Sequence, residues 1–123
     1  MNRKERPVLT DLVNEGTSEM EKFQNEVLRP VIKMQHSLLI SSFKHHLIKR
    51  KVDFTDLTDK KRRSKITSVF KTDNNYKNFT LGIIIGHFSS DEFTFYADNA
   101  SEINRRVLQI TAQRIKDSIL EVV

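Results

Sequence analysis

Gln35, Ser42 and His46 are the polar residues whose spacing most suggests a chemical role. On a helix that follows Pro30 they fall within a narrow arc, near the middle of its apolar stripe. Polar groups buried there are costly unless they are hydrogen-bonded, so each of the three needs a partner. The pattern fits a polar seam that sets the register of two helices, or a seam at a dimer interface. It also fits a ligand pocket in which His46 is a general base or ligand donor.

The histidines lack the spacing of a helical metal site. His45 and His46 point about 100° apart on a helix, whereas such sites use residues three or four positions apart. His87 and Asp91 have that separation, but a helix break is expected between them. The chain has no cysteine, no phosphate loop, no Gly-x-Ser-x-Gly elbow and no dinucleotide fingerprint. We therefore predict no metal and no cofactor, and the sequence favours a non-enzymatic protein over an enzyme.

Positive charge is concentrated in one part of the chain. Ten of the 21 Lys and Arg residues lie between positions 44 and 71, where there are three aspartates. The candidates for binding an acidic partner or a nucleic acid lie in segment 49–65: Lys49, Arg50, Lys51, Lys60, Lys61, Arg62, Arg63 and Lys65. Aromatic residues do not alternate with these cations, so we expect attraction to phosphates rather than base stacking. The alternative is a solvated helix end followed by a solvated loop.

Two glycines are spaced four apart in the apolar segment Gly82-x-x-x-Gly86. Each costs roughly 1 kcal/mol relative to alanine inside a helix, so a compensating contact is expected. Because neither glycine has a Cβ, we predict that a neighbouring helix packs closely against this face. A ligand pocket lined by backbone is the alternative.

The rest of the chain reads as helices that would position these residues. The 123 residues are enough for one domain, and we predict a flexible tail over 1–17 followed by one helical domain over 18–123. Ser18-x-x-Glu21 is a helix start, and the first helix runs to about Arg50 with a bend or a restart at Pro30. Further helices are expected over 57–71, over 75–88 with Asp73 or Asn74 as its cap, over a short stretch after Ser89, and over 102–121. The predicted fold class is all-α with about five helices, the long N-terminal and C-terminal helices packing around the hydrophobic helix 75–88.

The segment Phe79–Ala97 has a second interpretation as a β-hairpin. Its β-branched and aromatic residues and its two glycines favour strands. The capping box Ser89-x-x-Glu92 and the helical neighbours favour helix, which is our prediction.

Several features point to a soluble cytoplasmic protein. The basic start of the chain is not followed by the apolar stretch of a signal peptide. The longest uncharged run, Asn78 to Ser90, is too short to cross a bilayer, so no membrane partner is predicted.

Two parts of the sequence resemble a family of small proteins from Bacteroidetes-type bacteria. They are Phe23-Gln-Asn-Glu-Val-Leu-Arg-Pro-Val-Ile-Lys-Met-Gln35, and Gly82-Ile-Ile-Ile-Gly-His-Phe88 continuing through Asn99-Ala-Ser-Glu-Ile-Asn-Arg-Arg106. The resemblance covers the chain from about Ser18 onward and implies an all-helical fold in a bacterial cytoplasm. Some members are labelled glyoxalase, but this sequence has neither the strands of a glyoxalase I module nor a His-x-His-x-Asp-His cluster. The resemblance therefore implies no catalytic residue.

The last predicted helix suggests self-association. Its apolar arc is wider than one neighbour would cover, with Ile103 and Ile110 on one side and Leu108, Ile115 and Ile119 on the other. Arg114 lies beside this arc, where its stem covers apolar surface or its guanidinium pairs with an acid such as Glu26 or Asp98. We expect a non-enzymatic protein that forms a homodimer. The alternatives are the acidic-partner or nucleic-acid binder of segment 49–65, and a ligand binder or enzyme at Gln35, Ser42 and His46.

Overall fold

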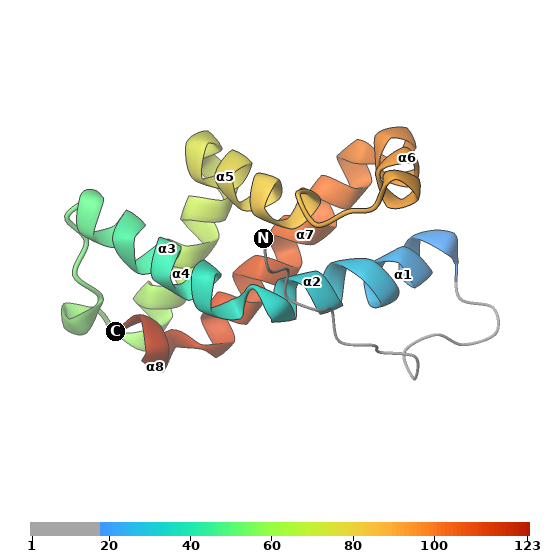
Figure 1. Cartoon of the computed structure of the whole chain (residues 1–123). Helices are drawn as coiled ribbons and strands as arrows, with labels where there is room; N and C mark the ends of the chain where they lie inside the picture. Colours follow the sequence, from blue (N-terminus) through green and yellow to red (C-terminus); the bar gives the residue numbers. More distant parts are fainter. Residues whose placement is uncertain (1–17) are drawn as a thin grey trace.

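The computed structural model describes residues 18–123, and the predicted N-terminal tail lies outside this range. Within it the chain is helical and contains no strand, so the all-α prediction is confirmed and the β-hairpin alternative for 79–97 is wrong. The elements are α1 (Glu19–Phe23), η2 (Gln24–Leu28), α2 (Arg29–Met34), α3 (His36–Lys49), η3 (Phe54–Asp56), α4 (Asp59–Thr72), α5 (Asn74–Ile85), α6 (Ser90–Asp98), α7 (Ala100–Asp117) and α8 (Ile119–Val122) (Figure 1). When the continuous run of α1, η2 and α2 is counted as one helix and the short 3-10 turn η3 is left out, residues 18–123 form seven helices, more than the predicted five.

The N-terminal helix continues through Pro30 because its preceding turn is widened. The Ser18 side chain caps it by accepting the Glu21 N–H at 3.1 Å, as the sequence predicts. Proline lacks an N–H, and its ring clashes with the carbonyl four residues earlier in a regular α-helix. Here η2 is a π-helical turn in which the Arg29 N–H bonds to the Gln24 carbonyl, and Pro30 lies in the first turn of α2. The interruption comes later, at Gln35, whose φ of −96° and ψ of 17° separate α2 from α3.

Side-chain caps set where the middle helices begin. Thr58 accepts the Lys61 N–H at the start of α4, and Asp73 accepts the Tyr76 N–H at the start of α5. Ser89 and Glu92 form the reciprocal capping box that the sequence predicts for α6. Asp73 is the only residue between α4 and α5, so its cap also fixes the turn between these two helices.

The helix at the centre of the fold is α7, and the prediction that helix 75–88 is central is wrong. α7 contacts η2, α2, α3, α4, α5, α6 and α8, whereas α5 lies on one face of the molecule, across α4 and α7 (Figure 1). α5 buries Tyr76, Thr80 and Ile84, while Phe79 keeps 49% of its surface exposed. α5 therefore has apolar residues on all of its sides but is buried on only some of them.

The wide apolar arc predicted for the last helix packs mainly against helices of the same chain. Of its five residues, Ile103, Ile115 and Ile119 are buried, and Leu108 and Ile110 are half-buried and pack against the two core clusters. The arc therefore no longer points to a second subunit. None of the helices between residues 18 and 123 combines the length and apolar character needed to cross a bilayer.

Candidate functional site

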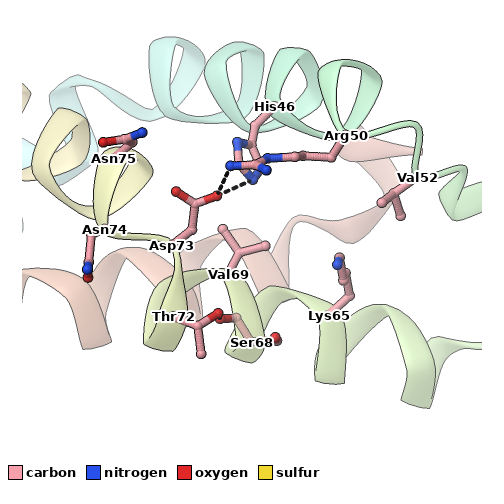
Figure 2. A pocket seen from close by; sticks show the side chains of 10 residues that line it. All are labelled: His46, Arg50, Val52, Lys65, Ser68, Val69, Thr72, Asp73, Asn74 and Asn75. Atoms are coloured by element: carbon pink, nitrogen blue, oxygen red, sulfur yellow. Dashed lines mark hydrogen bonds and ion pairs between the residues drawn. The ribbon is translucent and has the colours of Figure 1, made fainter.

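Asp73 brings together the end of α3 and the junction of α4 and α5. Its Oδ2 lies 3.3 Å from His46 Nε2 and 3.0 Å from Arg50 Nη2 (Figure 2). Its Oδ1 accepts the Tyr76 N–H at 3.1 Å. His46 and Arg50 are one helical turn apart on α3, which allows both side chains to reach the same carboxylate oxygen.

The surroundings keep His46 neutral and Asp73 charged. Burial lowers the pKa of His46 and outweighs the opposite effect of the Asp73 carboxylate, and the nearby cations Arg50, Lys65 and Lys49 lower it further. The Tyr76 N–H bond lowers the pKa of Asp73, with smaller contributions from His46 and Arg50. At neutral pH the imidazole N–H therefore faces a carboxylate, and Arg50 supplies the balancing positive charge.

A cavity of about 530 Å³ opens beside this cluster. Its lining consists of His46, Arg50, Val52, Lys65, Ser68, Val69, Thr72, Asp73, Asn74 and Asn75 (Figure 2). Apart from the two valines, every lining residue carries a polar or charged group, and Asp73 is the one carboxylate among them. Arg50 is 56% exposed and Lys65 has no carboxylate partner among residues 18–123, so both can meet a ligand. We call this space the His46 cavity.

The three residues of the predicted pocket all face α5 or its ends, but they do not share one cavity. Gln35 Nε2 lies 2.6 Å from His87 Nε2, and the Ser42 hydroxyl lies 3.2 Å from the Tyr76 hydroxyl while donating to the Leu39 carbonyl. With His46 and Asp73, these contacts form a polar seam between α3 and α5. Of the three, only His46 lines the His46 cavity.

The structure divides the predicted basic segment into paired and unpaired cations. Arg50 and Lys65 line the His46 cavity, Arg62 Nε donates to the Phe54 carbonyl at 2.8 Å, and Arg63 pairs with Asp59 at 3.0 Å. The remaining lysines are exposed and have no carboxylate partner among the described residues: Lys49, Lys51, Lys60 and Lys61. Lys51 also ends α3, because its φ of 59° turns the chain away from the helix.

The predicted close packing at Gly82 and Gly86 is wrong for the described residues. A Cβ built on Gly82 would meet none of their atoms within 4 Å. A Cβ on Gly86 would lie 3.0 Å from the Gly82 carbonyl oxygen, within its own helix end. Gly86 therefore serves the end of α5, where its N–H bonds back to that carbonyl. Among residues 18–123, no neighbouring helix therefore packs closely against Gly82.

Arg114 has a partner, but a different one from those the sequence suggested. Its Nε donates to His36 Nδ1 at 2.9 Å, and His36 Nε2 in turn lies 3.0 Å from Glu121. This chain of contacts ties the start of α3 to α7 and α8. No acid on α1, η2 or α6 takes part in it.

Sequence reasoning identified His46, Arg50 and Lys65 but placed them in two separate hypotheses. It recognised Asp73 only as a possible helix cap, because nothing local indicates that this carboxylate meets α3. Within residues 18–123, no group of three or more His, Asp or Glu side chains is placed to hold a metal ion. Comparisons with models of protein families, with curated proteins and with solved structures found no match for the chain.

Proposed function

We propose that the protein is a non-enzymatic binding protein for nucleic acid, which it contacts through phosphate groups at the His46 cavity and along α4. The observation that carries this proposal is the row of cationic and hydroxyl side chains on one side of α4. Lys65, Ser68 and Thr72 line the cavity, and Lys61 lies one turn before Lys65 on the same side. These positions span about 16 Å at the rise of an α-helix.

The chemistry of the cavity favours phosphates over an acidic protein surface. Protein interfaces have a core of buried apolar and aromatic groups, whereas this cavity offers two valines among hydroxyls, amides and cations. Hydroxyls, amides, Lys and Arg are the groups that contact nucleic-acid backbones. Such contacts carry no sequence information, so binding is expected to be general. It would suit the cytoplasmic location expected from the sequence.

Fluorescence anisotropy with a labelled single-stranded RNA tests the proposal. Binding through about three phosphates should weaken with salt, with a log–log slope of roughly −2. The double variant Lys61→Glu/Lys65→Glu should lose at least about tenfold in affinity. Lys22→Glu/Lys33→Glu makes the same change in net charge on exposed positions of α1 and α2 and should lose much less.

Three outcomes would contradict the proposal. They are binding that does not respond to salt, equal losses in the two double variants, and binding to poly-glutamate as tight as binding to RNA. The last result would indicate an acidic protein partner at the same surface.

We also propose self-association, on a different observation. The Ser42–Tyr76 contact joins α3 to α5, the Gln35–His87 contact joins the residues beside their ends, and each helix exposes a large apolar side chain. Leu38 on α3 is 44% exposed and Phe79 on α5 is 49% exposed. Light scattering at micromolar concentration should give the mass of a homodimer, and Phe79→Lys should reduce it to that of a monomer. A monomer for the unaltered chain would contradict this second proposal.

A further inference from the structure

A second cavity lies on the opposite side of α4 from the His46 cavity. It is a groove of about 710 Å³ between α4, α5 and α7. The lining residues are Thr67, Phe70, Lys71, Lys77, Arg105, Leu108, Gln109, Ala112, Gln113 and Lys116. We call it the α4–α7 groove. Its volume falls within the roughly 300–1,000 Å³ typical of small-molecule sites.

The floor of this groove is apolar and already held in place by the core. Phe70 and Ala112 are buried, and Leu108 packs against the same core cluster. The Phe70 ring stacks on Phe43 with centroids 6.3 Å apart and meets the Tyr76 ring edge-on at 5.5 Å. A ligand would therefore meet a rigid surface and would not need to order it first.

The rim of the groove is cationic. Lys71 comes from α4, Lys77 from α5, and Arg105 and Lys116 from α7, and no carboxylate is among the lining residues. Arg105 is neutralised by Glu102, whose pKa is held at about 2 by hydrogen bonds from Arg105 and Arg106. The three lysines have no carboxylate partner within residues 18–123, and Lys77 Nζ lies 3.4 Å from the Lys71 carbonyl oxygen. An uncompensated positive rim thus surrounds an apolar floor.

From this combination of an apolar floor and a cationic rim, we propose that the α4–α7 groove binds a small amphiphilic anion. Such a molecule has an apolar body and a carboxylate or phosphate head. The apolar body lies on Phe70, Leu108 and Ala112, and the head meets the lysines. The α7 residues of the lining run from Arg105 to Lys116, which corresponds to about 16 Å along the helix. Three apolar side chains are too few for a stable protein partner, which buries about 800 Å² per side, so the occupant is a small molecule.

Binding can be measured with the fluorescent anion anilinonaphthalene sulfonate and with competitors that differ in the head group alone. Decanoate and decyl phosphate should displace the probe, and decanol should do so at least about tenfold less well. The better of the two anions identifies the head group. Equal displacement by decanol would overturn the proposal, because the lysines would then contribute nothing.

Two variants locate the site on the folded chain. Lys77→Glu/Lys116→Glu should weaken decanoate binding at least about tenfold, whereas the matched control Lys22→Glu/Lys33→Glu should leave it nearly unchanged. Thr67→Trp places a large side chain at an exposed position of the rim and should block the groove without disturbing the core. Equal effects of the two charge reversals, or decanoate binding that survives Thr67→Trp in a chain shown by circular dichroism to be folded, would overturn the assignment. RNA binding at the His46 cavity is measured separately, so either proposal can fail alone.

Discussion

The two sides of α4 show how one helix can border two different kinds of cavity. Val69 and Phe70 are neighbours in sequence, yet Val69 lines the polar His46 cavity and Phe70 lies in the floor of the α4–α7 groove. The polar cavity lies where α3 ends and α5 begins, and helix ends carry unpaired backbone groups and the capping side chains that satisfy them. The groove lies against the middle of α7, where backbone groups are paired and side chains alone determine the surface. The two sites therefore differ mainly in whether they lie at helix ends or along the middle of a helix.

The largest effect is expected from truncating the floor of the groove. Phe70→Ala removes a buried ring that stacks on Phe43, and should lower the free energy of unfolding by about 3 kcal/mol in urea titrations. At a temperature where the variant remains folded, decanoate binding should be lost and RNA binding retained. Loss of both would show that the two sides of α4 are not independent.

A smaller loss is expected at the polar side. Asp73→Ala removes the cap of α5 and leaves His46 and Arg50 without their shared acceptor, so the free energy of unfolding should fall by about 2 kcal/mol. Asp73→Asn keeps a capping oxygen but no charge, and should lose about half as much. Equal losses in the two variants would mean that the charge, and not the cap, stabilises this junction.

The change of stability with pH should come from His46 and not from the adjacent His45. The folded chain lowers the pKa of His46 below its usual 6.5, so the unfolded chain takes up the proton first as the pH falls. The stability associated with neutral His46 is therefore complete above pH 6.5 and is lost as the pH falls through the pKa of the folded state. Melting temperatures between pH 7.5 and 5 should fall less steeply for His46→Gln than for the unaltered chain. His45→Gln, at the exposed adjacent position, is the matched control, and an equal effect of both variants would contradict this account.

The smallest effect should be a gain in stability. Thr111 on α7 is fully buried, and its hydroxyl has no hydrogen-bond partner among the described residues. Valine has nearly the same shape without the hydroxyl, so Thr111→Val should raise the free energy of unfolding by about 1 kcal/mol. Both ligand affinities should stay as they are. A loss of stability would indicate that the hydroxyl has a partner in solution.

Local patterns in the sequence predicted most of the elements. The caps at Ser18, Asp73 and Ser89 follow from side chains that reach backbone N–H groups three residues away. The arc of Gln35, Ser42 and His46 predicted polar contacts for a similar reason, because helical periodicity puts them on one side. Their partners His87, Tyr76 and Asp73 were not predictable, since each lies at least 27 residues further along the chain.

The sequence by itself determined the helical class, the capped starts of the helices and the uneven distribution of charge, because these depend on interactions between near neighbours. Only the tertiary structure decided that α7 is central and that Asp73 joins His46 and Arg50. It also decided that lysines from three helices surround one apolar floor. These results depend on which faces of the helices meet. That choice is made by the packing of the whole core, in which Phe79 and Gly82 remain outside although their segment is the most apolar in the chain.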